Sequence, residues 1–239
     1  MNILVTGVSK GLGLTTVQYL LQQGYNVYGI SRSTNNTLAD LKNEYPNHFF
    51  HLPYDLANVE DINKAIFKSF LKAVSLDGFV NNAAMAYDDI ATNMNIANLE
   101  NMFKVNVYSP FNLTKYALRN FLLYKKAGSI IHISSVSVHT GYKGLSMYAS
   151  TKGALEAYSK NIAREWGEMQ IRSNCIVSGF MDTEMSSSLS DDQKNRIYNR
   201  TSLKSPTDPS SIAATIEWLL SNKSKSVTGQ NIFVDSGTI

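Results

Sequence analysis

The sequence predicts an α/β protein: one domain built on a doubly wound parallel sheet, with helices on both faces. Three observations predict it. Short, β-rich apolar segments alternate along the chain with longer segments of helical period. The β-rich segments are nearly continuous apolar runs, as expected for strands that are covered on both faces. A glycine-rich turn, TGVSKGLG, follows the first of them directly.

The composition limits the classes of function. Of the 239 residues, 44% are hydrophobic and 17% charged, which argues against disorder. The net charge of +3 is too small and too scattered to indicate a nucleic-acid partner. No apolar run approaches the roughly 18 residues that cross a bilayer, and the opening MNILVTG enters a strand without a charged leader. We therefore expect no membrane partner and no leader.

Cysteine and histidine usage point to a reducing compartment and no metal. Cys175 is the only cysteine, so no internal disulfide can form, and we expect a cytoplasmic location. Its neighbours in NCIV favour a buried strand residue over a reactive thiol. The four histidines show no metal-ligand spacing, so no metal site is expected.

The first helix follows the first strand. After NILVT (2–6), the apolar residues Leu14, Val17, Leu20 and Leu21 recur at helical spacing, and Gly24 ends the helix.

The remaining elements continue the alternation. Six further strands are expected at 26–30, 49–53, 76–80, 129–133, 173–177 and 231–234. Helical patterns lie near 58–73, 98–124, 148–167 and 208–221. No linker or internal repeat interrupts them, so we expect one domain over 1–239. Ligands of such a sheet bind outside the carboxyl ends of its strands.

The glycine turn predicts a nucleotide. Gly7, Gly11 and Gly13 lie between the first strand and the first helix. Such a turn lets a pyrophosphate approach the backbone at a helix N-terminus, where N–H groups are unpaired. The spacing differs from the standard G-x-G-x-x-G, so the motif alone indicates a nucleotide without identifying it.

The end of the second strand favours NADP(H). Ser31 occupies the position where NAD-binding sheets carry an acid, Arg32 follows it, and Lys10 lies inside the glycine turn. Two cations can hold a 2′-phosphate that a carboxylate would repel. The alternative is that both cations are solvated surface residues.

Tyr148 and Lys152 are four residues apart at the start of a predicted helix, and hence on one face. A nearby ammonium is expected to lower the phenol pKa, so that the phenol can exchange a proton with a carbonyl oxygen. The strand before this helix ends at Ser134 and Ser135, at the carboxyl edge where a ligand is expected.

These motifs resemble the compact branch of the short-chain dehydrogenase/reductase family over essentially the whole chain, most closely the 3-oxoacyl-[acyl-carrier-protein] reductases. The fold implied is a Rossmann-type sheet of about seven strands. The matching segments are Thr6-Gly7 with Gly11 and Gly13, Asp55-Leu56, NNAA (81–84), Asn106, Ser135, Tyr148, Lys152, Thr183 and VTGQNIFVDSG (227–237). The chain departs from the family at Ala84, Ser178 and Ser236, which replace glycine, proline and glycine.

The resemblance implies a catalytic role for four residues. Ser135 would polarise the substrate carbonyl and Tyr148 would transfer the proton. Lys152 would lower the phenol pKa and hold the nicotinamide ribose, and Asn106 would position a water that connects the lysine to solvent.

Two further sets of residues are expected around these four. The NADP(H) site would comprise Gly7, Ser9, Lys10, Gly11, Leu12, Gly13, Arg32, Asp55, Leu56, Asn82, Ala83, Tyr148, Lys152, Gly179 and Thr183. The substrate pocket would comprise Ser135, Tyr142, Tyr148, Met181 and Met185, beneath a lid at about 184–204. His139 is either an exposed loop residue or a substrate contact.

The expected function is NADPH-dependent reduction of a ketone to a secondary alcohol. A 3-oxoacyl thioester on an acyl carrier protein is one substrate: Lys126 aligns with a basic docking position of those reductases, although Met169 replaces its partner. A ketone of a sugar, polyol or small metabolite is the alternative.

Two other classes of function have less support from the sequence. A non-catalytic NADP(H)-binding regulator would be expected to lack part of the tetrad, and a nucleotide-sugar epimerase needs more than the roughly 50 residues that follow residue 190. The resemblance also implies a homotetramer packed through helices 98–124 and 148–167.

Overall fold

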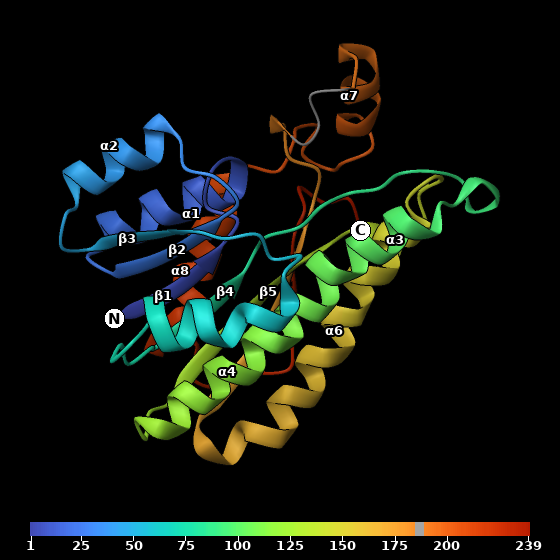
Figure 1. The fold of residues 1–239 in the computed structure, drawn as a ribbon. Helices are drawn as coiled ribbons and strands as arrows, with labels where there is room; N and C mark the ends of the chain where they lie inside the picture. Colours follow the sequence, from blue (N-terminus) through green and yellow to red (C-terminus); the bar gives the residue numbers. More distant parts are fainter. Residues whose placement is uncertain (185–188) are drawn as a thin grey trace.

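Seven parallel strands form one sheet in the computed structural model, which describes residues 1–184 and 189–239 (Figure 1). Their order is β3-β2-β1-β4-β5-β6-β7. The predicted doubly wound parallel sheet is confirmed, and no predicted strand end is displaced by more than two residues. The strands are β1 (Asn2–Thr6), β2 (Asn26–Ser31), β3 (Phe49–Pro53), β4 (Gly78–Asn81), β5 (Gly128–Ser135), β6 (Ile171–Ser178) and β7 (Asn231–Val234).

The order of the strands reverses between β1 and β4. The chain moves outward from β1 to β3 and then returns, so β4 pairs with the free side of β1. The crevice between the carboxyl ends of these two strands is where an open α/β sheet binds its ligand.

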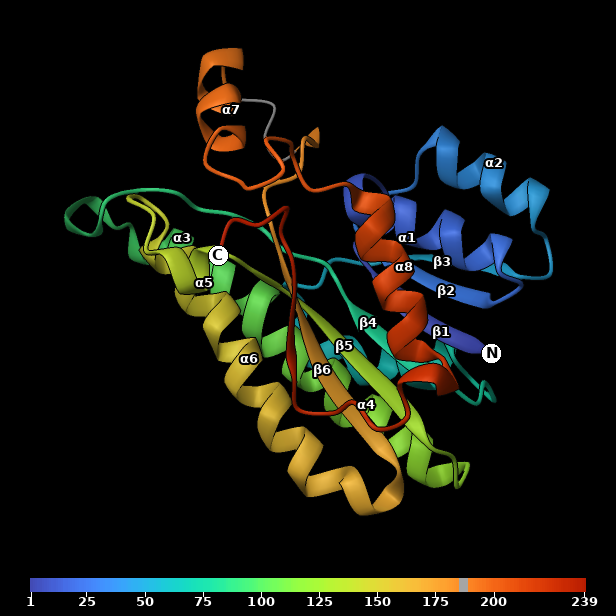
Figure 2. The ribbon, with the colours of Figure 1, turned by 180° about the vertical axis from the view of Figure 1, so that it is seen from behind.

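Helices cover both faces of the sheet (Figures 1 and 2). Helices α1, α2 and α8 lie on one face, and α4 and α6 lie on the other. The α-helices are α1 (Gly11–Gln22), α2 (Asn36–Glu44), α3 (Ile96–Phe103), α4 (Ser109–Leu123), α5 (Ser137–Thr140), α6 (Ser146–Trp166), α7 (Asp191–Tyr198) and α8 (Pro209–Leu220).

Each face of the sheet has its own apolar cluster. Ile3 and Val5 of β1 pack in the cluster beneath α1 and α8, whereas Leu4 between them packs in the cluster beneath α4 and α6. All three are fully buried. Successive strand residues point to opposite faces, so both sets must be apolar, which explains the continuous apolar runs. Burying each side chain contributes about 1.5–3 kcal/mol.

The helix predicted over 98–124 is interrupted. Between α3 and α4 the backbone forms a π-helical segment at Lys104–Tyr108, with Asn106 at its centre. Pro110 lies in the first turn of α4 and has no N–H to donate to the carbonyl four residues earlier, at Asn106. The continuous-helix prediction was wrong because it ignored this proline. The 58–73 region is likewise irregular, with a 3₁₀ turn at Val59–Asp61 and a π-helical segment at Asn63–Phe70.

Helix α7 lies beyond the carboxyl end of β6 and stands apart from the sheet (Figures 1 and 2). Ser190 caps it by accepting a hydrogen bond from the Gln193 amide, and Lys194 pairs with Asp182 at 2.7 Å. The predicted lid at 184–204 includes residues 185–188, which lie outside the described residues, so the lid stays a prediction.

Among the described residues, no helix is both long and apolar enough to span a bilayer. No group of three or more His, Cys, Asp or Glu side chains in residues 1–184 and 189–239 is arranged to hold a metal ion.

Candidate active site

A cavity of about 260 Å³ opens at the carboxyl ends of β1, β2, β4 and β5. It extends from the glycine turn after β1 to the first turn of α6. All of the residues predicted to bind the cofactor line it, with the exception of Gly179. Segments that are distant in the sequence therefore meet at one place, the switch point of the sheet.

The glycine turn is closely packed against its own backbone. Gly7 has a φ of 76°, in the left-handed region, and its N–H donates to the Ile30 carbonyl at 2.7 Å. A Cβ at Gly13 would lie 2.0 Å from the Gly7 carbonyl oxygen. At the N-cap, Lys10 makes no side-chain capping bond. The N-cap side chain therefore satisfies none of the first amides of α1, and amides of this kind at a helix N-terminus suit an anion.

Substituting Gly13 with alanine should destabilise the fold by about 1–3 kcal/mol, because the added methyl collides with rigid backbone. It should also weaken dinucleotide binding by displacing the turn. Urea unfolding and cofactor titration measure the two effects. Gly153→Ala is the matched control: its Cβ would meet only Val138 Cγ1, at 3.6 Å, inside α6. That variant should be slightly stabilised. Equal stability of the two variants would contradict the prediction.

Thr6 and Asn82 connect the ends of β1 and β4. The buried Thr6 Oγ1 accepts hydrogen bonds from the backbone N–H groups of Asn82 and Ala83 at 3.1 and 3.0 Å. Asn82 Nδ2 donates in return to the Thr6 carbonyl at 3.0 Å. These bonds hold the ends of β1 and β4 together and so constrain the floor of the cavity.

The end of β2 carries a hydroxyl and a cation. Ser31 is buried, and its Oγ donates to the Ser33 carbonyl at 2.9 Å and lies 2.8 Å from His51 Nε2. Arg32 and Lys10 are exposed at the same end of the cavity. Tyr54 also lines the cavity, although it was not among the predicted site residues. Its position directly after β3, at the carboxyl edge of the sheet, could have indicated it.

Tyr148 and Lys152 lie one turn apart on α6 and both line the cavity. Lys152 is only 2% exposed, and its Nζ donates to the Ile133 carbonyl at 2.8 Å. The same Nζ lies 5.7 Å from the centre of the Tyr148 ring. The ammonium is therefore anchored to strand β5 while remaining beside the phenol.

Burial controls both ionisations. It raises the pKa of the Tyr148 phenol above its usual value, and the Asp88 carboxylate raises it further. Burial also lowers the pKa of Lys152 to about 8. The expectation that the lysine lowers the phenol pKa was wrong for this structure: burial and then Asp88 shift the pKa of Tyr148 upward, and the Lys152 ammonium donates to the Ile133 carbonyl. Tyr148 is consequently a neutral phenol at pH 7.

Asn106 and Ser135 lie near this pair but are absent from the described lining of the cavity. Asn106 is 1% exposed; its Nδ2 donates to the Met85 carbonyl at 2.8 Å and to Thr151 Oγ1 at 3.1 Å, and its Oδ1 accepts from the Met85 amide at 2.9 Å. Met85 lines the cavity. Asn106 thus holds a segment of the wall, and a bridging water to Lys152 stays a prediction.

The predicted substrate residues are only partly brought together. Tyr148 and Met181 line the cavity, whereas Ser135 and Tyr142 do not belong to its described lining. Met185 lies outside the described residues. The substrate side is the region that sequence reasoning defined least well.

The prediction that Gly179 binds the cofactor is not supported by the cavity, whose described lining omits this residue. A Cβ there would lie 2.2 Å from Thr207 Oγ1 and 2.6 Å from the Asp235 Cα, so this glycine permits close packing beside β7. Its neighbour Ser178, which replaces the family's proline, lines the cavity instead.

Lys126, which aligns with a basic docking position for an acyl carrier protein, does not lie near the cavity. It lies two residues before β5 and forms an ion pair with Asp77 at 2.9 Å, just before β4. Both positions are at the amino edge of the sheet, opposite the cavity. Within one chain, Lys126 cannot lie at the mouth of the site.

Comparisons with known proteins extend over nearly the whole chain. A family model described as enoyl-(acyl carrier protein) reductase matches residues 7–238. A 3-oxoacyl-[acyl-carrier-protein] reductase of Chlamydia muridarum is 30% identical over 237 residues, covering 98% of this chain and 95% of that protein. A solved 4-hydroxyisoleucine dehydrogenase complexed with NADH has a TM-score of 0.92 at 26% identity, and ElxO with NADP bound has 0.88 at 25%. Each structural match covers 99% of this chain and 98% of the other.

Proposed function

The chain belongs to the short-chain dehydrogenase/reductase family, and on that premise we propose that it reduces a ketone to a secondary alcohol with NADPH. It is an NAD(P)-dependent oxidoreductase. The observation that carries the proposal is that Tyr148 and Lys152 line the same cavity as the glycine turn. A proton donor and a dinucleotide site therefore share one space.

The residues around the cavity fit NADP(H). The uncapped amino end of α1 suits the pyrophosphate, and Lys10 and Arg32 suit a 2′-phosphate. Lys152, on α6, would hold the nicotinamide ribose, and Thr183, which lies beside Gly11 in this structure, would hold the carboxamide. The bound cofactor supplies a hydride to the carbonyl carbon.

The side chains of this protein would handle the proton. Tyr148, neutral because burial raises its pKa, would donate a proton to the carbonyl oxygen as charge develops there. The Lys152 ammonium would stabilise the phenolate that results. Ser135 would donate a second hydrogen bond to the same oxygen.

The cations at the end of β2 should make kcat/KM higher with NADPH than with NADH. Arg32→Ala should reduce the ratio of kcat/KM with NADPH to kcat/KM with NADH by about 10- to 100-fold. This is the effect of losing a charge-assisted hydrogen bond worth about 1.5–3 kcal/mol. Arg119→Ala, which removes an exposed arginine from α4, is the control and should leave the ratio unchanged. A preference for NADH in the unmodified protein would overturn the NADPH assignment.

Ketone reduction should decline at alkaline pH. Because burial lowers the pKa of Lys152 to about 8, this side chain loses its charge above that pH while Tyr148 keeps its proton. The pH dependence of kcat/KM reports groups of the free enzyme, so kcat/KM should fall above about pH 8. A profile that stays level to about pH 10 would show that the lysine charge is not required.

The substrate we favour is a 3-oxoacyl thioester. Support comes from the Chlamydia muridarum relative, whose name specifies that reaction, with 95% of its length covered. A screen of NADPH oxidation with acetoacetyl thioesters, keto-sugars and simple ketones tests it, and a 2-enoyl thioester tests the reaction named by the family model. Acetoacetyl thioesters should give the highest kcat/KM. Reduction of the enoyl thioester alone would contradict the proposal.

A small-metabolite ketone is the second candidate. The placement of Lys126 favours it, since that cation is paired with Asp77 at the opposite edge of the sheet and cannot guide a carrier protein to the cavity of its own chain. Keto-sugars or simple ketones would then exceed acetoacetyl thioesters in the same screen.

A further inference from the structure

The hydroxyl of Ser135 accepts two hydrogen bonds from one residue. The backbone N–H of Ser137 donates to Ser135 Oγ at 3.2 Å, and Ser137 Oγ donates to the same oxygen at 3.0 Å. A serine hydroxyl has two acceptor lone pairs and one donor proton. Ser137 therefore fills both acceptor positions of Ser135.

The proton of Ser135 remains available. Among the residues that the structure describes, the hydrogen bonds of Ser135 Oγ are only those that it accepts from Ser137. A hydroxyl with both lone pairs engaged can act only as a donor. This is the state required of a group that polarises a carbonyl oxygen, and accepting two hydrogen bonds strengthens its own donation.

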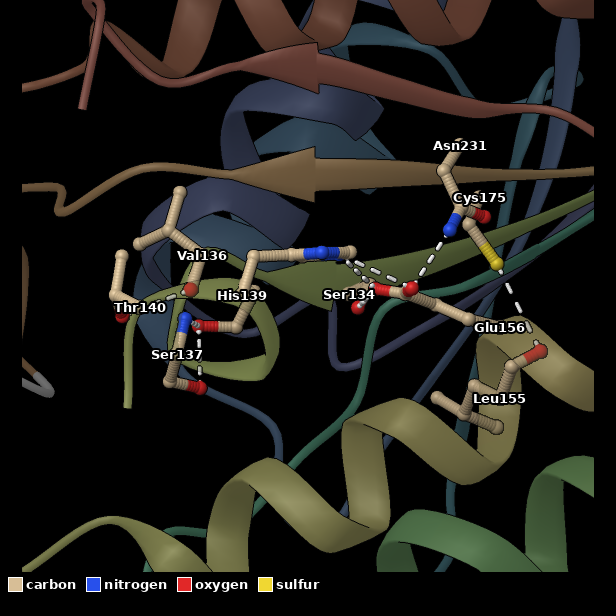
Figure 3. Close-up of polar contacts among 10 residues, drawn as sticks. Ser134, Val136, Ser137, His139, Thr140, Leu155, Glu156, Cys175 and Asn231 are labelled. Atoms are coloured by element: carbon tan, nitrogen blue, oxygen red, sulfur yellow. Dashed lines mark hydrogen bonds and ion pairs between the residues drawn. The ribbon is translucent and has the colours of Figure 1, made fainter. Parts of the chain in front are cut away.

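A buried carboxylate fixes the segment that carries both serines. Glu156, on α6, is 6% exposed and accepts hydrogen bonds from Ser134 Oγ and from Asn231 Nδ2, the latter at 2.6 Å. His139 Nε2 lies 3.1 Å from the same carboxylate. Figure 3 shows Glu156 between these three side chains. Of the two alternatives for His139, the structure favours the exposed residue: it lies on α5, pairs with Glu156 and does not belong to the described lining of the cavity.

The contacts of Glu156 lie on both sides of the two serines. Ser134 immediately precedes Ser135, and His139 follows Ser137 by two residues in the short helix α5. Both ends of the Ser135–Ser137 segment contact one carboxylate, the Ser134 contact being buried and the His139 contact part-buried, so the segment cannot rotate without breaking one of them.

We infer that Ser137 is a positioning residue that makes Ser135 an obligate hydrogen-bond donor to the substrate carbonyl, within a frame held by Glu156. The inference rests on the proposed function, in which Ser135 contacts the carbonyl oxygen. Ser137 itself is 3% exposed and acts through Ser135 rather than by touching the substrate.

A double-mutant cycle tests this inference. Ser137→Ala should lower kcat by about three- to tenfold, the effect of one lost hydrogen bond, with little change in NADPH affinity or Tm. In a Ser135→Ala background the same substitution should change kcat by less than about twofold, because its target is gone. An equal loss in both backgrounds would show that Ser137 does not act through Ser135.

Ser137→Cys separates hydrogen bonding from packing. The thiol nearly keeps the side-chain volume but donates weakly, so its kcat should fall as that of Ser137→Ala does. Full activity of the cysteine variant would assign Ser137 to packing and overturn the inference. If Ser135→Ala were fully active while Tyr148→Phe was inactive, the inference would fail and the proposed function would survive.

Neutron diffraction of deuterium-exchanged crystals gives a readout independent of turnover. The Ser137 hydroxyl deuteron should lie toward Ser135 Oγ, and the Ser135 deuteron should point away from Ser137. The reverse arrangement would overturn the inference even if no ketone proved to be a substrate.

Discussion

Replacing Tyr148 with phenylalanine should lower kcat for ketone reduction by about 10²- to 10⁴-fold, the usual contribution of a positioned proton donor. The substitution removes one oxygen and keeps the ring. Tyr148 lines the cavity beside Lys152, and burial keeps its phenol protonated at neutral pH, so this phenol is placed to supply the proton. Steady-state NADPH oxidation with the preferred ketone measures the loss.

A second tyrosine on α6 provides the matched control. Tyr158 is partly buried, donates weakly to the Phe111 carbonyl at 3.4 Å, and lies more than two turns from Tyr148. Tyr158→Phe should leave kcat within about twofold. NADPH titration of Tyr148→Phe should give nearly the unmodified affinity, which separates lost chemistry from lost binding. Near-normal turnover by Tyr148→Phe would remove this residue from the mechanism.

Replacing Lys152 with methionine should lower kcat/KM by roughly 10²-fold or more, because both the ammonium and its anchor are lost. Methionine retains most of the apolar length of the chain. It leaves the Ile133 carbonyl without the hydrogen bond that Lys152 Nζ donates at 2.8 Å, and no positive charge then favours the phenolate of Tyr148. In contrast to Tyr148→Phe, affinity for NADPH should also fall.

Lys160→Met, eight residues further along α6, is the control for the loss of a lysine. Its side chain is exposed, so its removal should not alter kcat/KM measurably. A Lys152→Met variant with unmodified NADPH affinity would mean that this lysine contributes only to the chemical step.

Much of the fold could be predicted from the sequence because local pattern and tertiary burial agree. Each strand is short, apolar and bounded by turn residues, and both faces of the sheet are covered, so periodicity and packing give the same assignment. The prediction of a continuous helix failed at residues 104–108, which form a π-helical segment. Pro110 lacks the N–H that would bond to the carbonyl four residues earlier, so the irregularity precedes the proline in the sequence. The oligomeric state and the extent of the single domain stay predictions.

The site could be predicted where its residues lie in local motifs. The glycine turn and the pair Tyr148 and Lys152 each depend on spacing within a few residues, and all of them line the cavity. The pKa of Tyr148 could not be predicted, since it depends on how deeply the folded chain buries the phenol. The contact of Glu156 with Asn231 joins elements 75 residues apart and leaves no local pattern.

The central claim is that this cavity transfers a hydride from NADPH to a carbonyl carbon. Mass spectrometry of the product formed with NADPH deuterated at C4 of the nicotinamide, in each of its two stereoisomers, tests it most directly. We expect a secondary alcohol that carries one deuterium on the carbinol carbon with one of the two stereoisomers, formed about 10²- to 10⁴-fold more slowly when Tyr148 is replaced by phenylalanine. Unlabelled alcohol with both stereoisomers, or no alcohol from any ketone by a protein that binds NADPH, would contradict it.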